Sequence, residues 1–184
     1  MMRRTVKGAF LGVLAAMSVA GAVPAAAAGA EGHTAVMDGK SVDLSRGWGE
    51  AQTCVVRSES AQVTHTVCYR SAGEADAALG VPAGAQGVSS ILDCPSGWLC
   101  LWENEYGGGR RLLFSDEYGH DLAQWDFAYK TSSFFNMQDG PPICTSADDP
   151  GELWDFQYYS LRLDPCAGQN TMGAWNDRAT RVFG

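Results

Sequence analysis

The chain has 184 residues, of which 46% are hydrophobic and 18% are charged. This composition suits one or two compact domains, and it argues against a disordered chain and against a large enzyme with separate cofactor and substrate domains. The net charge of −8 becomes −11 if the cations Arg3, Arg4 and Lys7 are removed. Because so acidic a surface repels phosphate backbones and the longest basic run is Arg110-Arg111, we expect no nucleic-acid partner.

Residues 1–28 have the composition of a signal peptide. The three cations precede a short apolar run over residues 8–19, and residues 23–28 carry the A-x-A pattern that a signal peptidase accepts. The apolar run is shorter than the roughly 20 residues that cross a bilayer core. We therefore expect a secreted, extracellular protein without a membrane span.

Export to an oxidising compartment predicts that the six cysteines form disulfides. The sequence allows many pairings, but the spacing favours the most local one, in which each bridge closes a single hairpin or loop. The predicted pairs are Cys54 with Cys68, Cys94 with Cys100, and Cys144 with Cys166. A zinc site is disfavoured because the chain has no C-x-x-C pair and its three histidines are scattered.

Aromatic residues divide the predicted mature chain, since 16 of the 19 lie beyond residue 91. Residues 29–80 are expected to form a small β-rich segment with little core of its own. Residues 81–91 are rich in small side chains and predict a linker. Residues 92–184 are expected to form the main domain.

Within the first segment, residues 63–69 alternate with the period of a strand, and residues 51–57 are its predicted partner. His65 lies on the face that carries the valines, and we interpret it as a partly buried strand residue without a catalytic role. Ser71, followed three residues later by Glu74, predicts the capped start of a short helix.

The main domain is rich in strand and turn signals. Its residues 130–135 and 178–183 form a weak internal repeat, each copy following a tryptophan. A predicted hairpin together with this repeat favours an all-β fold, with Greek-key sheets packed as a sandwich. The predicted strands are residues 98–102, 111–114, 132–135, 153–158 and 181–183.

An aromatic stripe falls on the fourth of these strands. Trp154, Phe156 and Tyr158 alternate with polar residues, a spacing that suits either a sugar-stacking surface or a sandwich core. We favour the core. Leu161 and Leu163 occupy odd-numbered positions, so in a continuous strand they would lie on the face opposite the stripe. We therefore expect a bulge or turn near residues 158–159.

No enzyme motif is present: the chain lacks G-x-S-x-G, H-E-x-x-H and a phosphate-cradling loop. Its one acid–histidine cluster consists of Asp116, Glu117, His120 and Asp121, which we interpret as solvated turn residues. We expect neither catalysis nor a cofactor.

Four stretches of the main domain together resemble a known family. They are residues 94–104 (CPSGWLCLWEN), 106–110 (YGGGR), 131–136 (TSSFFN) and 175–182 (WNDRATRV). They are similar to the secreted actinobacterial βγ-crystallin-like domains grouped with the Streptomyces metalloproteinase inhibitor family. The resemblance implies a disulfide-stapled double Greek-key fold that inhibits zinc metallopeptidases through a rigid surface loop. We expect a monomer whose partner is an extracellular peptidase.

The same resemblance implies calcium binding between paired loops. Asn176, Asp177 and Thr180 keep half of the expected ligand pattern, whereas Ala128 and Tyr129 stand at the acidic positions of the first copy. In the other possible alignment of the first copy, Phe127 and Ala128 occupy these positions, and neither pair can ligate calcium through its side chains. This predicts weak calcium binding or none. The alternative function is a structural or envelope-associated crystallin-like module with weak or lost calcium binding.

The candidate inhibitory loop lies between the two halves of the main domain. Residues 139–151 are rich in Pro and Gly, which predicts a surface segment. Its candidate contact residues are Pro142, Ile143, Cys144 and Thr145, with Ile143 as the side chain that enters a hydrophobic peptidase pocket. The alternative is an ordinary linker in which Ile143 folds back onto the sheet.

Overall fold

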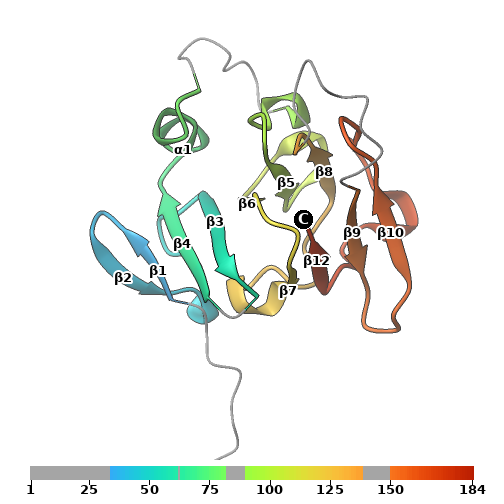
Figure 1. Ribbon diagram of the computed structural model, residues 1–184, viewed down its shortest axis with the longest axis horizontal. Helices are drawn as coiled ribbons and strands as arrows, with labels where there is room; N and C mark the ends of the chain where they lie inside the picture. The colour runs from blue at the N-terminus through green and yellow to red at the C-terminus, as the bar shows by residue number, and fades with distance from the viewer. Residues whose placement is uncertain (1–33, 62, 82–89, 139–149) are drawn as a thin grey trace, which may run out of the picture.

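The computed structural model describes residues 34–61, 63–81, 90–138 and 150–184. These residues form two β-sheets that pack face to face, with a short α-helix beside the larger sheet (Figure 1). Within the described ranges, no helix has the length and apolar content needed to cross a membrane. The predicted signal peptide lies outside these ranges. The all-β class predicted from the sequence is confirmed.

The larger sheet has eight strands in the order β11-β8-β5-β6-β3-β4-β1-β2. The smaller sheet has four strands in the order β10-β9-β12-β7. The strands of the larger sheet are β1 (Thr34–Met37), β2 (Lys40–Asp43), β3 (Thr53–Ser60), β4 (Val63–Tyr69), β5 (Leu99–Trp102), β6 (Arg111–Phe114), β8 (Ser133–Asn136) and β11 (Gly168–Gln169). Those of the smaller sheet are β7 (Gly119–Asp121), β9 (Gly151–Trp154), β10 (Ser160–Leu163) and β12 (Arg181–Phe183), and the helix is α1 (Ala72–Ala78).

The main domain consists of two groups of four strands, β5 to β8 and β9 to β12. In each group the third strand pairs in the opposite sheet, so β7 lies beside β12 and β11 lies beside β8. The two repeat copies meet at the centre of this exchange. The Tyr129 amide donates to the Ala179 carbonyl (2.8 Å), and the Asp177 amide donates to the Thr131 carbonyl (3.0 Å). This reciprocal pair gives the sequence repeat a structural basis.

The first segment is not separate from the main domain. Strand β3 pairs in parallel with β6, in a register that places Thr53 opposite Arg111 and Val56 opposite Phe114. Thr53, Cys54, Val55 and Val56 are all buried. A run of consecutive buried residues is typical of a strand that is covered on both faces. An edge strand of a small independent unit would instead have one face exposed.

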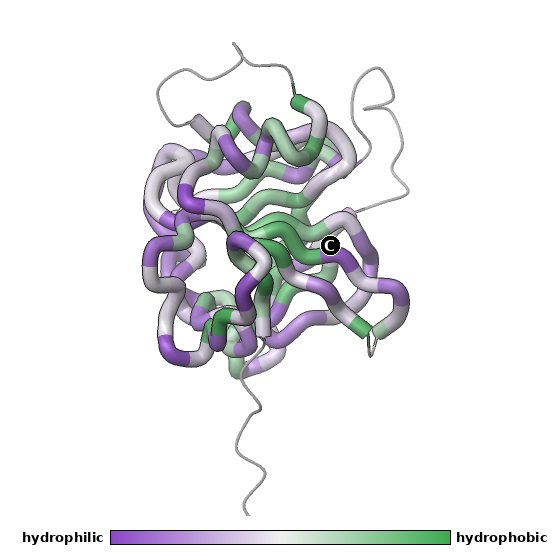
Figure 2. Tube along the Cα trace, turned by 90° about the vertical axis from the view of Figure 1, so that its left-hand side faces the viewer, coloured by the Kyte–Doolittle hydropathy of each residue, from purple (hydrophilic) through white to green (hydrophobic). Residues whose placement is uncertain are grey.

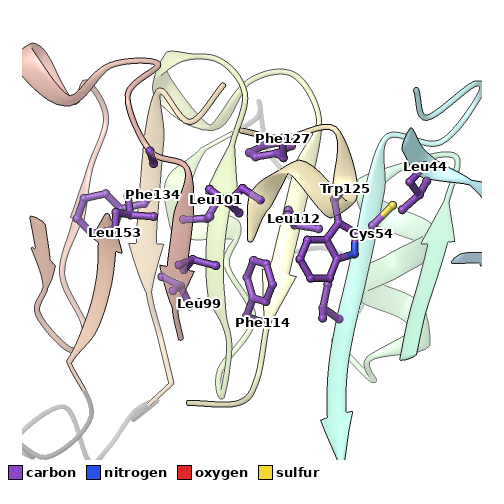
Figure 3. Packing of buried hydrophobic residues seen from close by; sticks show 14 of the residues in the cluster. Leu44, Cys54, Leu99, Leu101, Leu112, Phe114, Trp125, Phe127, Phe134 and Leu153 are labelled. Atoms are coloured by element: carbon purple, nitrogen blue, oxygen red, sulfur yellow. The ribbon is translucent and has the colours of Figure 1, made fainter. Parts of the chain in front are cut away.

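The core between the sheets therefore draws on both segments. Figure 3 shows Leu44 and Cys54 of the first segment near Trp125, in the same cluster as Leu112, Phe114 and Leu153. Figure 2 shows the apolar residues gathered on the strands in the middle of the molecule, with hydrophilic residues in the surrounding turns. The first segment has few apolar residues of its own because its buried side chains form part of a core that it shares with the main domain.

Two tryptophans join the segments by hydrogen bonds as well as by packing. The buried Trp125 indole donates to the Thr66 hydroxyl on β4 (3.0 Å), and the Trp48 indole donates to the Trp125 carbonyl (2.5 Å). Thr66 and Cys68 thus form the buried face of β4, while Val63 and Val67 lie on its exposed face. His65 shares that exposed face and is not partly buried as predicted.

Two of the three predicted disulfides are confirmed. Cys54 and Cys68 are direct partners across β3 and β4, and the Cys94–Cys100 bridge ties β5 to the turn before it. In the chain-entropy model, closing a loop of about 15 residues stabilises a fold by roughly 3 kcal/mol. Cys144 lies outside the described residues, so the pairing of Cys144 with Cys166 stays a prediction.

The predicted helix start is also confirmed. The Ser71 hydroxyl accepts a hydrogen bond from the Glu74 amide (3.1 Å), and the Glu74 carboxylate accepts one from the Arg70 amide (2.9 Å). The end of the predicted linker is ordered, since Ile91 is buried in a short 3₁₀ helix, Ile91–Asp93, that begins with its own capping box.

A buried ion pair connects these parts. Arg111 on β6 is buried, and its guanidinium donates to the Asp76 carboxylate of α1 (2.5 Å), the Ala72 carbonyl (3.2 Å) and the Asp93 carbonyl (3.0 Å). Its backbone amide donates to the Gln52 carbonyl just before β3 (2.8 Å). One residue thus anchors α1, the 3₁₀ helix and the junction between the segments.

Replacing Asp76 with alanine should therefore destabilise the whole fold. Asp76→Ala leaves the Arg111 charge buried without its carboxylate, which costs about 3–5 kcal/mol in comparable cases. Urea unfolding of the variant measures the loss. The control is Glu50→Ala, which removes an exposed partner of Arg70 and should cost less than about 1 kcal/mol. Equal losses in the two variants would contradict a central role for the buried pair.

Candidate functional site

The predicted calcium residues do not converge on a common point. The Asn176 side-chain amide donates to the Asp177 carboxylate (2.8 Å), and the Thr180 hydroxyl donates to the Trp154 carbonyl (3.2 Å). The hydroxyl that contacts the Asp177 carboxylate is that of Ser132, from the first repeat copy (3.1 Å). Residues of one repeat copy contact residues of the other copy. The sequence of a single copy therefore could not show that Ser132 lies beside Asp177. Among the described residues, no three carboxylates, cysteines or histidines cluster as a metal site would require.

The acid–histidine cluster is structural, and its central pair is not solvated as predicted. His120 and Asp116 are both buried, and the imidazole Nε2 lies 2.6 Å from the Asp116 carboxylate. His120 also stacks on Phe114, with ring centroids 5.1 Å apart. Burial would raise the pKa of Asp116, but the hydrogen bonds from His120, Ser58 and the Tyr118 amide and the charge of His120 together lower that pKa. The pair ties β7 to the loop before it.

A cavity of about 420 Å³ lies between the end of α1 and the Cys94–Cys100 bridge, with apolar walls from Leu79, Leu92 and Trp98. Its acidic groups are already engaged, since Asp76 binds Arg111 and the Asp93 carboxylate accepts the Ser90 amide (3.0 Å). Both acids of the described lining therefore already have partners.

The turn between β9 and β10 is a more distinctive surface. It projects from the end of the smaller sheet, opposite the end at which β9 begins (Figure 1). The bulge or turn predicted near residues 158–159 is confirmed as a turn, which spans residues 155–159 between the two strands. The Asp155 amide donates to the Tyr159 carbonyl (3.0 Å), and the Tyr158 amide donates to the Asp155 carbonyl (3.2 Å).

Asp155 holds this turn from within. Its buried carboxylate accepts hydrogen bonds from the amides of Gln157 (2.8 Å) and Tyr159 (2.9 Å) through Oδ1, while Oδ2 accepts from Arg178 Nε (2.8 Å). Burial would raise the pKa of Asp155, but these amides and the Arg178 guanidinium together lower it. The carboxylate is therefore charged at neutral pH and fixes the backbone of the turn to the segment before β12.

The aromatic side chains of the turn point outward. The exposed fractions are 62% for Phe156, 74% for Tyr158 and 60% for Tyr159. The prediction that Phe156 and Tyr158 belong to the core is therefore wrong. Their alternation with polar residues continues the pattern of β9, but the strand itself ends at Trp154 and the turn carries both rings out of the sandwich.

Arg178 completes the surface beside the turn. Its guanidinium lies over the ring of Tyr159 (5.5 Å to the centroid) and over the ring of Trp175 (5.1 Å). Cation–π contacts of this kind restrain the side chains that make them. No local sequence pattern indicates this contact, because Arg178 and Tyr159 are far apart in the chain and lie in different turns of the second strand group.

The candidate inhibitory loop, Pro142, Ile143, Cys144 and Thr145, lies outside the described residues. The residues on either side of it are well anchored. The Gln138 amide donates to the Asn136 side chain (3.1 Å) at the end of β8, and the buried Gly151 begins β9. The loop therefore connects one sheet to the other.

Comparison with known proteins supports one family. Residues 89–141 match the sequence model of peptidase inhibitor family I36. No curated protein and no solved structure matches the chain. The matched residues include β5 to β8 and three of the four stretches that resemble the metalloproteinase inhibitors. The match supports a peptidase inhibitor, a class of protein that acts by binding and carries out no catalysis of its own.

Calcium should stabilise this protein very little. A ligand present near its dissociation constant contributes only RT ln 2, about 0.4 kcal/mol, so millimolar calcium should barely move the melting temperature. Thermal unfolding with calcium, with magnesium and with chelator measures the effect. Tight calcium binding by calorimetry that disappears in Asp177→Ala would contradict this prediction.

Proposed function

We propose that the protein is a secreted inhibitor of an extracellular metallopeptidase, which it blocks by placing a rigid surface segment in the substrate cleft. The observation that carries the proposal is the match of residues 89–141 to a peptidase inhibitor family. The predicted signal peptide and the confirmed disulfides, which persist in oxidising compartments, support secretion. The metallopeptidase target follows from the sequence resemblance.

Rigidity is the physical requirement for such an inhibitor. A flexible segment loses conformational freedom when it enters a cleft, whereas a segment already held in its bound shape avoids most of that cost. Here the Cys94–Cys100 bridge and a core shared by both sheets hold the framework. The two ends of each surface segment between strands are consequently held in place by this framework.

The loop around Ile143 remains one proposed contact. Gln138 and Gly151, which flank it, are tied to opposite sheets, and Pro141 and Pro142 restrict the backbone between them. Ile143 is the large apolar side chain of the loop, and it suits the hydrophobic pocket of a thermolysin-like enzyme. This contact rests on sequence and on the anchored ends.

The direct test is an inhibition assay of the mature protein against purified peptidases. Zinc and serine peptidases are assayed with peptide substrates, and each is preincubated with the protein before substrate is added. We expect inhibition of at least one zinc peptidase with stoichiometric titration, because a preorganised contact dissociates slowly. Failure to inhibit any zinc peptidase would favour the alternative of a structural or envelope-associated module.

The role of Ile143 is tested separately. Ile143→Asp should weaken inhibition at least tenfold, about 1.4 kcal/mol, because a carboxylate is costly in an apolar pocket. The melting temperature should stay nearly unchanged. Unaltered inhibition would remove this loop as a contact, and a large drop in melting temperature would show that Ile143 belongs to the core.

A further inference from the structure

We infer that the β9–β10 turn, residues 155–159, is a second peptidase-contacting surface, in which Phe156 and Tyr158 enter apolar subsites of the substrate cleft. The inference rests on the proposed inhibitory function and names the surface and side chains that carry it out. Four features of the turn support it: its preorganised backbone, its exposed rings, its lack of charge and its position in the fold.

The backbone is fixed before any partner arrives. The buried Asp155 carboxylate binds two amides of the turn and the Arg178 guanidinium, and Tyr159 is further restrained by the stacked Arg178. The Asp155 carboxylate is buried, so a partner can bind the tip without breaking its hydrogen bonds. The entropy of ordering the turn is lost on folding and does not oppose binding.

The exposed rings have the chemistry of a binding hot spot. Tyrosine and phenylalanine each offer about 150–250 Å² of surface for burial and have only two side-chain torsions to restrict. Phe156 and Tyr158 are more than half exposed, so most of that surface is available to a partner. A subsite that accepts an aromatic or large aliphatic residue of a substrate would accept either ring.

The tip carries no charge, although the protein as a whole is strongly acidic. Residues 156–160 read FQYYS, and the nearest acids are already occupied: Asp155 binds Arg178, and the Glu152 carboxylate accepts the Trp154 indole N–H (2.8 Å). Entry of the tip into a dry cleft therefore buries no unpaired charge, which would be the most costly event at such an interface.

The turn is independent of the Ile143 loop. Gly151 begins β9 and Trp154 ends it, so the loop joins one end of the strand and the turn joins the other. A strand of four residues is about 13 Å long. Substitutions in the turn therefore report on a contact distinct from that of Ile143.

The first strand group provides a matched control. Tyr106 lies between β5 and β6, as Tyr158 lies between β9 and β10, and both have left-handed backbones, with φ of 58° and 64°. Tyr106 is 60% exposed. Its turn also contains Glu103 and Glu105, so it resembles Tyr158 in backbone and exposure but stands in a charged setting.

The experiment compares three variants against a thermolysin-like zinc peptidase that the wild-type protein inhibits. Tyr158→Asn removes the ring and keeps a residue that tolerates the left-handed backbone, Phe156→Ser removes the second ring, and Tyr106→Asn is the control. We expect inhibition constants at least tenfold higher for Tyr158→Asn and Phe156→Ser, and a change of less than about twofold for Tyr106→Asn. All three should keep the wild-type melting temperature, because the rings they remove are exposed.

The outcomes separate the two proposals. If the wild type inhibits no zinc peptidase, the proposed function fails and this contact fails with it. If the wild type inhibits and Tyr158→Asn and Phe156→Ser inhibit equally well, the function stands and the turn is excluded. Retention of the wild type, but not of Tyr158→Asn, on insoluble chitin or cellulose with unchanged inhibition would assign the rings to sugar stacking and overturn the inference.

Discussion

The structure depends on the parallel pairing of β3 with β6 and on the buried Arg111 that secures it. This pairing joins the cysteine-bridged hairpin of the first segment to the main domain and extends one sheet across both. Arg111 lies at the junction, where its guanidinium satisfies the Asp76 carboxylate of α1 and the carbonyls of Ala72 and Asp93. Because a buried guanidinium is costly unless its donors are bound, the pairing of the strands and the placement of α1 and the 3₁₀ helix are coupled. The core that the sheets enclose is therefore built from both segments.

Local features were predictable from the sequence, and contacts between distant residues were not. The Cys54–Cys68 and Cys94–Cys100 bridges, the helix cap at Ser71 and the turn after β9 follow from spacing and parity over a few residues. The hairpin of β1 and β2 was missed, although its Asp38-Gly39 turn carries the left-handed angles that favour this dipeptide. The β3–β6 pairing joins residues more than fifty positions apart, and no local pattern specifies such a pairing. The same limitation explains why Ser132 was not expected beside Asp177, nor Arg178 beside Asp155.

The two strand groups use related turns in different ways. Glu103 follows β5 as Asp155 follows β9, and each carboxylate binds an arginine. In the first group the partner is Arg110 of the same turn, which also binds Asp126 (3.3 Å) and lies over the Trp48 ring (4.9 Å), so this pair contributes to the packing of the first segment. In the second group the partner is Arg178 of a later segment, and the turn itself remains uncovered. The two turns thus differ: the ion pair of the first contributes to the packing of the first segment, whereas the second is held from beneath by Asp155 and presents its aromatic rings to solvent.

This division has a consequence for how the proposed complex forms. Electrostatic attraction mainly raises association rates, and it is screened beyond about 8 Å at physiological ionic strength. An uncharged tip gains little from electrostatic attraction, so tight binding has to come from slow dissociation. Dissociation is slow when much apolar surface is buried and when the turn loses little conformational entropy on binding. Asp155 contributes to both, because it fixes the backbone that presents Phe156 and Tyr158 while remaining buried and out of reach of the partner. In the proposed complex, the residue that governs the shape of the contact is therefore buried beneath it.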